Sequence, residues 1–197
     1  MKNIRILGDV VRIKLKEMGL PATPYIIAEN LLLLAICAHF TFFLPFSDAP
    51  HSFLPLAVIL IGAIYGIKSG LLGICIFAVL SLIGFPEFLN EGAELWHSPG
   101  VLMAFIPAVG LAGLSANFEW DRDLKRSLYF IGLAHLIILG GGFVWLKATN
   151  HNPLPDAQSL LLSFAPSILI NTVIGGILLK IFWEAVLNYD TDSETIQ

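Results

Sequence analysis

Apolar residues along this chain gather into six long stretches, and short polar or charged segments separate them. A helix that crosses the roughly 30 Å hydrocarbon core of a membrane needs about 20 mostly apolar residues. The stretches are Tyr25–Phe46, Phe53–Ile67, Leu71–Phe85, Val101–Phe118, Leu128–Leu146 and Ser159–Val186. The pattern predicts an all-α integral membrane protein, folded as a bundle of six transmembrane helices.

The second and third stretches are short for membrane spans, and the segment Gly66–Gly70 joins them. A short span in lipid is accommodated by tilt, by local thinning or by burial among longer helices. We therefore expect these two stretches to form a close helical hairpin with a tight turn, packed inside the bundle. Backbone polar groups in lipid must be satisfied internally, and strand-like alternation is absent, so helices are expected throughout.

The basic residues divide unequally between the two sides of the predicted membrane. With the N-terminus in the cytoplasm, only Lys147 of the eleven Lys and Arg residues lies outside. The others lie inside or at the inner edge: Lys2, Arg5, Arg12, Lys14, Lys16, Lys68, Arg122, Lys125, Arg126 and Lys180. Basic residues near span ends are retained in the cytoplasm. This distribution predicts a multi-pass protein of the cell (plasma or inner) membrane, with both termini cytoplasmic.

The two ends of the chain differ from the membrane domain, which we assign to residues 24–187. Residues 1–23 form an amphipathic cytoplasmic segment, which Pro21 and Pro24 are expected to separate from the first span. This segment is either a helix lying on the membrane surface near anionic lipid heads or a plain positive-inside anchor. Residues 188–197 are polar and acidic, and we expect them to form a fraying cytoplasmic tail.

The composition agrees with a membrane protein and excludes several functions. The chain is 56% hydrophobic and 13% charged, and its mean hydropathy is +0.80, far from the values of a soluble domain. The net charge of −4 gives no reason to expect nucleic acid as a partner. Motifs of the HExxH and GxSxG types and paired intramembrane carboxylates are absent from the sequence. We therefore expect no enzyme activity, no catalytic residues and no cofactor.

Polar side chains gather toward the predicted outer side. Asn171 lies partway along the sixth stretch, with Ser167 one turn before it, and an Asn inside a span usually faces protein or a cavity. Four of the five histidines lie at outer span ends or in external loops: His39, His51, His97 and His151. These groups predict a pocket that opens outward. Imidazole also suits nickel or cobalt, but no two of these histidines share a span at i, i+4 spacing, and we expect no metal site.

Small residues recur at intervals of four, which allows helices to approach closely. They are Gly62, Gly66 and Gly70 in one region and Ala104, Ala108 and Ala112 in another. They can serve contacts within the bundle or a docking face for another membrane subunit, and the spacing does not separate these two interpretations.

Several segments carry a family resemblance in a consistent order. Ala49–Gly70 is similar, without a gap, to a region with a Val-Pro-Ile-Thr-Leu-Gln segment and a following Leu-Gly-Pro-Arg-x-Gly turn. Leu82–Phe88 resembles Leu-Ile-Gly-Leu-Pro-Val-Phe, Ser98–Gly113 resembles Pro-Thr-Gly-Gly-Tyr-Leu-Ile-Gly-Phe, and Gly142–Leu146 resembles Gly-x-x-Trp-Leu. These are segments of the BioY biotin-uptake family, and together they cover most of residues 45–175.

The resemblance implies a substrate-binding S component of an energy-coupling-factor transporter. Such a component is a six-helix membrane protein that binds a vitamin, here biotin, from outside. It delivers the vitamin by toppling in the membrane lipid when it is docked to a transmembrane T subunit, which two ATPase subunits drive. The chain itself would hydrolyse nothing.

The sequence departs from the family where biotin is expected to bind. The family segment Pro-Phe-x-Pro-Gly-Asp-x-x-Lys, whose Asp and Lys are expected to hold biotin, corresponds to Ser163–Asn171. Ile168 replaces the Asp and Asn171 replaces the Lys, while Leu54 and Val101 stand for a Gln and a Tyr. The carboxylate of biotin therefore needs another partner in this chain.

We predict a substrate site in the outer half, between the 87–99 loop and the last three spans. Ser167 and Asn171 would supply hydrogen bonds from one helical face, because residues four apart lie on the same side. An Asn amide can orient a ureido group through its paired donor and acceptor. Around them, Trp145 would form an apolar wall, Ser98 and Gly100 would approach from the facing span, and His97 or His51, if protonated, or neutral donors would meet the carboxylate.

Two alternatives remain open at this point. In the first, the chain keeps the family fold as a non-transporting membrane scaffold or a lipid- or small-molecule-binding subunit, and the outer half should be packed solid. In the second, the chain is an S component for another vitamin or for a divalent metal, and a metal requires three histidines to converge.

Overall fold

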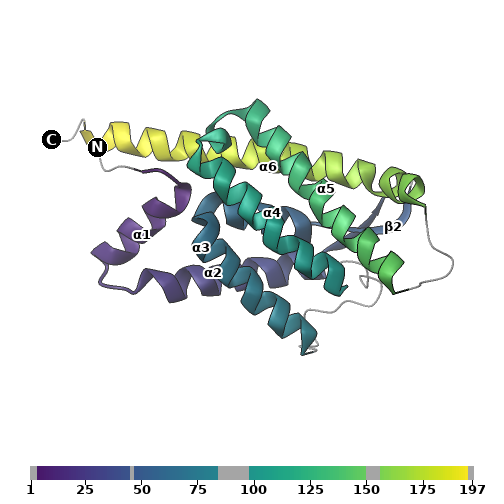
Figure 1. The fold of residues 1–197 in the computed structure, drawn as a ribbon. Helices are drawn as coiled ribbons and strands as arrows, with labels where there is room; N and C mark the ends of the chain where they lie inside the picture. The colour runs from purple at the N-terminus through teal and green to yellow at the C-terminus, as the bar shows by residue number, and fades with distance from the viewer. Residues whose placement is uncertain (1–3, 45–46, 84–97, 150–155, 195–197) are drawn as a thin grey trace.

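The computed structural model describes residues 4–44, 47–83, 98–149 and 156–194. Its elements, in chain order, are α1 (Leu7–Glu17), α2 (Ala22–His39), β1 (Thr41–Leu44), β2 (Ser47–Ser52), α3 (Leu54–Leu82), α4 (Pro99–Asn117), the 3-10 turn η2 (Trp120–Arg122), α5 (Leu124–Ala148) and α6 (Ala157–Glu194). Within these residues, the five helices α2 to α6 have apolar parts long enough to cross a membrane. The predicted all-α bundle is therefore confirmed (Figure 1).

Helix α3 covers most of both short stretches, and the chain turns sharply between them at Gly66. This glycine has φ 76° and ψ 178°, a conformation that is essentially restricted to glycine. A Cβ added to Gly70 would lie 3.4 Å from the Cα of Gly62, whereas eight residues of continuous helix would separate these positions by about 12 Å. The two arms therefore pack side by side as the expected hairpin, with the reversal at a single residue.

The first arm of α3 forms the centre of the bundle. All residues from Leu54 to Ala63 are buried. A Cβ on Gly62 would lie 2.8 Å from the carbonyl oxygen of Val109 and 3.0 Å from the Cβ of Ala112. The small residues thus bring α3 and α4 into backbone contact. Of the two roles considered for them, these positions serve contacts within the bundle. Gly62 and Ala112 face each other inside the chain and are not free to dock another subunit.

The expectation of an uninterrupted first span, without strands, was wrong. Helix α2 ends at His39, and the following residues form an antiparallel hairpin in which Phe42 pairs with His51 and Thr41 pairs with Ser52. Aromatic and β-branched residues favour strands, and Thr41–Leu44 consists of such residues and a leucine. The ladder satisfies backbone groups that a longer helix would otherwise have paired.

The ends of the chain also differ in detail from the prediction. Helix α2 begins at Ala22, so Pro24 lies in its first turn, where a proline is tolerated, and only Pro21 precedes the helix. Helix α6 continues to Glu194. The first seven residues of the segment predicted as a fraying tail are therefore helical.

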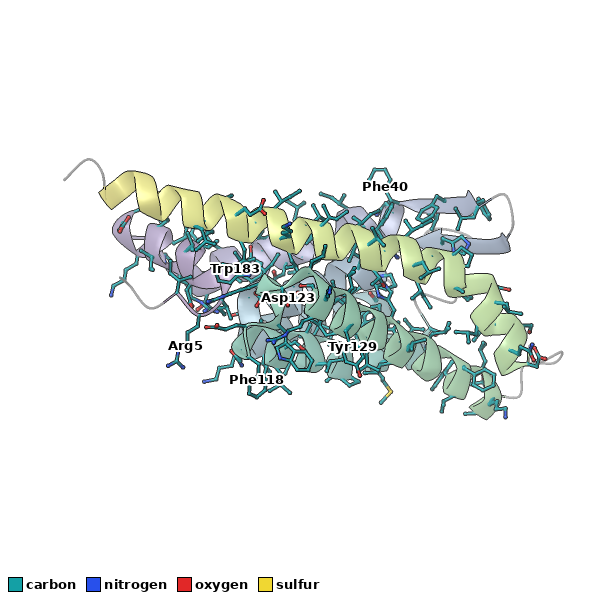
Figure 2. The ribbon with its side chains drawn as sticks, turned by 90° about the horizontal axis from the view of Figure 1, so that it is seen from above. Arg5, Phe40, Phe118, Asp123, Tyr129 and Trp183 are labelled. Carbon is teal, nitrogen blue, oxygen red and sulfur yellow. The ribbon has the colours of Figure 1, made fainter. Side chains whose placement is uncertain are left out.

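Several basic residues lie together at one end of the bundle. Arg12 on α1 donates to the carbonyl oxygen of Tyr65 at 3.0 Å and to the hydroxyl of Ser69 at 2.9 Å. Arg122 donates to the carbonyl oxygen of Ile4 at 3.1 Å. Figure 2 shows Arg5, Asp123 and Trp183 at this same end. We call it the basic end; that it faces the cytoplasm remains a prediction.

Candidate functional site

A hydrogen-bonded junction joins the β-hairpin to α6 away from the basic end. The side-chain amide of Asn171 donates to the carbonyl oxygen of Ser52 at 3.2 Å. The hydroxyl of Ser52 donates to the carbonyl oxygen of Cys37 at 3.2 Å and accepts from the backbone N–H of Leu54 at 3.1 Å. Ser52 and Asn171 are both buried. The end of β2 is thus fixed against α2, α3 and α6 together.

His51 lies directly beside this junction and is completely buried. Its ring is 5.7 Å from the ring of Phe42 and 5.7 Å, edge to face, from the ring of Phe164, measured between centroids. Neither ring nitrogen has a hydrogen-bond partner among the described residues. Burial lowers the pKa of His51, so the ring is neutral at pH 7. It therefore presents one donor and one acceptor that are both unused.

Helix α5 contributes a second buried histidine, His135, which the sequence analysis missed. Its Nδ1 lies 2.9 Å from the carbonyl oxygen of Ile131. Because a carbonyl only accepts, this contact places the proton on Nδ1 and leaves Nε2 as an acceptor. Nε2 has no partner within the described part of the chain. An ionisable residue in the middle of an apolar span is itself an indication of function, and the sequence offered that indication.

His135 and Asn171 line a small interior cavity, and His51 packs against Phe164 of the same lining. Its volume is about 10 Å³, which is room for one water molecule. Its lining comes from α3, α5 and α6 and includes Pro55, His135, Ile138, Phe164, Ser167 and Asn171. The Oδ1 of Asn171 is buried and lacks a described partner. Unpaired buried polar atoms are rare in folded proteins, and several at one cavity are typical of a ligand site.

The structure divides the predicted site residues into two groups. Ser167, Asn171 and His51 belong to the interior cluster just described. Gly100 and Trp145 instead pack against each other and line an open groove of about 410 Å³ between α4 and α5. The groove uses the face of α5 opposite His135, because Val144, which lines it, is nine residues further along the helix and points in the opposite direction. The expected apolar wall at Trp145 is therefore not part of the interior cavity.

The remaining two predicted residues have other positions. Ser98 is the N-cap of α4, where its hydroxyl accepts from the backbone N–H of Val101 at 3.4 Å. This is the usual role of serine at a helix start. His97 lies outside the described residues.

These features define a class: a multi-pass helical membrane protein with a buried polar cluster in its interior. The chain belongs to the BioY family, whose model matches residues 14–188. A crystal structure described as the "S-component for biotin from an ECF-type ABC transporter" has the same fold, with a TM-score of 0.67 and 20% sequence identity. The match covers 82% of this chain and 90% of the other. No curated protein sequence matches the chain.

Proposed function

We propose that this chain is the membrane-embedded substrate-binding component of a biotin-uptake system. Membership of the BioY family over residues 14–188 supports the class of function. The fold shared with an S-component for biotin supports the same substrate. The observation that carries the proposal is that His135 and Asn171 line an interior cavity with polar atoms that have no partner among the described residues, and that His51, also without one, packs against Phe164 of the same lining.

The polar cluster suits the ureido ring of biotin, which has two N–H donors and one carbonyl acceptor. Oδ1 of Asn171 and Nε2 of His135 are unused acceptors, and they match the two donors. The neutral ring of His51 retains one unused N–H, which matches the carbonyl. A ligand that satisfies these atoms relieves the penalty for burying them unpaired, about 1–3 kcal/mol for each group.

The carboxylate of biotin requires a different explanation from the ring. Ile168 and Asn171 replace the Asp and Lys of the family pattern, and His51 is neutral because burial lowers its pKa. We therefore propose that His51 meets the ligand as a neutral ring and not as a charged partner of the carboxylate. We propose that neutral donors, with Ser167 the nearest in this cluster, or His97 in the preceding loop meet the carboxylate toward the outer side.

Binding must enlarge the cavity. Ligand pockets usually measure about 300–1,000 Å³, against about 10 Å³ here. The contact that opens in our proposal is the hydrogen bond from Asn171 to Ser52, which closes the cavity between α6 and the hairpin. The ligand then replaces the Ser52 carbonyl oxygen as the acceptor of the hydrogen bond from the side-chain amide of Asn171. In this proposal, the structure described here is the form in which the cavity is closed.

Transport requires further subunits in this proposal. A T subunit and two ATPase subunits would energise uptake, because the sequence contains no phosphate-binding loop of the kind that holds nucleotide phosphates. The same proposal places both termini and the basic end in the cytoplasm. Membrane lipids surround the apolar outer faces of the helices.

Uptake of labelled biotin by cells that lack biotin transport tests this function. Cells that express the chain together with T and ATPase subunits should accumulate biotin, and cells that express the chain alone should show at most slow equilibration. Asn171→Leu should abolish most of the gain, while Leu169→Ala, at an exposed position of the same helix, should retain it. Equal accumulation by the Asn171→Leu and wild-type proteins would contradict the proposed site.

One observation favours a second function. The interior around this cavity is almost solidly packed, because the cavity measures only about 10 Å³. Such packing is expected of a membrane scaffold that keeps the family fold without transporting anything. Biotin binding separates the two functions. A folded scaffold binds no biotin, whereas a folded substrate-binding component does.

A further inference from the structure

A second hollow lies at the basic end, away from the interior cluster. Its volume is about 390 Å³, it is open to the surface, and its lining consists of Trp120, Lys125, Arg126 and Tyr129. The rings of Trp120 and Tyr129 lie 6.4 Å apart between centroids, at 60° to each other. Trp and Tyr are enriched where a membrane meets water. The hollow therefore combines two cations with two side chains typical of the interface.

The two cations are available to an external anion. Arg126 approaches Asp123 only loosely, with Nε 3.9 Å from Oδ2 and both side chains more than half exposed, so the pair contributes little. Lys125 forms no ion pair in the part of the chain that the structure describes. Arg122, by contrast, pairs with Glu119 at 3.2 Å and lies over the ring of Trp183. With Asp123 as the adjacent carboxylate, the lining keeps a net positive charge.

An apolar surface continues from the hollow along the same helix. Tyr129, Leu133 and Leu136 are 65%, 38% and 48% exposed, and their spacing of four and three residues places them on one face of α5. Figure 2 shows Tyr129 and Phe118 on the side of the bundle away from α6. From the start of α5 onward, the helix presents the cations first, then the ring of Tyr129, and then the two leucines. That order matches the headgroup, glycerol and acyl regions of a phospholipid.

We propose that this hollow binds an anionic phospholipid of the inner leaflet. The phosphodiester lies between Lys125 and Arg126, the rings of Trp120 and Tyr129 lie at the level of the glycerol, and an acyl chain follows Leu133 and Leu136. Basic pockets beside membrane helices on the cytoplasmic side are suited to anionic headgroups. The continuous apolar face selects a lipid over free phosphate. This site is separate from the interior cluster, so it does not depend on which substrate the protein carries.

Native mass spectrometry of the purified full-length protein tests the proposal, with phosphatidylglycerol and phosphatidylcholine of identical chains as probes. The wild-type protein should retain phosphatidylglycerol with a preference of roughly tenfold or more, the order expected for two cations beside an anionic headgroup. Lys125→Gln with Arg126→Gln should remove the preference. Arg5→Gln with Lys180→Gln, which removes two exposed cations elsewhere at the same end, should preserve it.

Two controls separate the possible sources of the effect. Millimolar inorganic phosphate should not displace the retained lipid, and displacement by phosphate alone would overturn the assignment to a phospholipid. The melting temperature of both double variants should equal that of the wild-type protein in phosphatidylcholine. An undiminished preference in the Lys125→Gln, Arg126→Gln protein would overturn the site, as would its loss in the Arg5→Gln, Lys180→Gln control.

Discussion

The side-chain amide of Asn171 donates a 3.2 Å hydrogen bond to the backbone carbonyl of Ser52, 119 residues earlier in the chain. This contact joins α6 to the β-hairpin and closes the interior cavity. It also uses only half of the amide, because the Oδ1 of Asn171 has no partner among the described residues. One residue thus holds the closed form together and presents an unused acceptor to a ligand.

Replacement of Asn171 tests both roles. Asn171→Leu removes the donor to Ser52 and the free acceptor, and it leaves the Ser52 carbonyl buried without this partner. A neutral hydrogen bond contributes about 0.5–1.5 kcal/mol, and more when a buried partner is stranded, so biotin affinity should fall roughly tenfold or more. Titration calorimetry on the purified variant measures this change. Leu169→Ala should leave the affinity unchanged, and a similar fall in that control would assign the effect to general disturbance of α6.

The apolar pattern of the sequence predicts the helices well, because a membrane helix depends on length and hydrophobicity alone. The reversal at Gly66 was also predictable, since two short stretches meet at a glycine-rich turn. The β-hairpin was not, because Thr41–Leu44 is as apolar as the span before it. The strand depends on pairing with residues 47–52, which no local pattern reveals.

The candidate site was predictable only in part. Asn171 and Ser167 are polar residues in an apolar span, and their spacing alone places them on one face. Trp145 lines a different hollow from Asn171, because the rotation of α5 against its neighbours is decided by packing. The same rotation brings His135 inward. Its position within an apolar span could have identified it, but its partners could not be known without the fold.

Gly100 should be indispensable for the contact between α4 and α5. A Cβ at this position would overlap the Cβ of Trp145 and lie 2.8 Å from the carbonyl oxygen of Gly141. Gly100→Ala should therefore destabilise the protein by about 1–3 kcal/mol, the usual cost of overpacking. Gly110→Ala on the same helix is the matched control, because its Cβ would meet nothing within 4 Å. Thermal unfolding in detergent should separate the two variants; equal melting temperatures would show that the helices separate easily at Gly100.

Asp121 should make the folded protein less stable as the pH rises, whereas a carboxylate with a lowered pKa has the opposite effect. Its carboxylate accepts from the indole N–H of Trp183 at 2.7 Å, and burial raises its pKa to about 6. The unfolded chain has a value of about 3.9, so the folded state binds more protons between these pH values, and stability falls as pH rises through that window. The full penalty, about 3 kcal/mol, is present above pH 6.

The comparison with Asp121→Asn isolates this effect, because Asn keeps an oxygen acceptor for Trp183 and does not titrate. The melting temperature of the wild-type protein should rise relative to that of the variant as the pH falls from about 7 to about 4.5. Asp123→Asn, at the exposed N-cap of α5, should follow the wild-type protein. A constant difference between the wild-type protein and Asp121→Asn across this range would refute the raised pKa.

The orientation in the membrane can be tested by cysteine labelling of intact cells. The native Cys37 and Cys75 are first replaced by alanine, since Cys75 is exposed. A membrane-impermeant maleimide should then label Asn150→Cys, in the predicted external loop, and spare Lys68→Cys, near the Gly66 turn. The retention of basic residues in the cytoplasm is the reason for this expectation. Strong labelling of Lys68→Cys in sealed cells would reverse the topology.

Direct binding of radiolabelled biotin to the purified protein in lipid nanodiscs tests the central proposal most directly. We expect saturable binding of one biotin per chain, displaced by unlabelled biotin and weakened when Ser167→Ala and Asn171→Leu are combined. A parallel melting curve establishes that each preparation is folded. The absence of saturable biotin binding by folded wild-type protein would contradict the proposed function and favour a scaffold or an S component for another substrate.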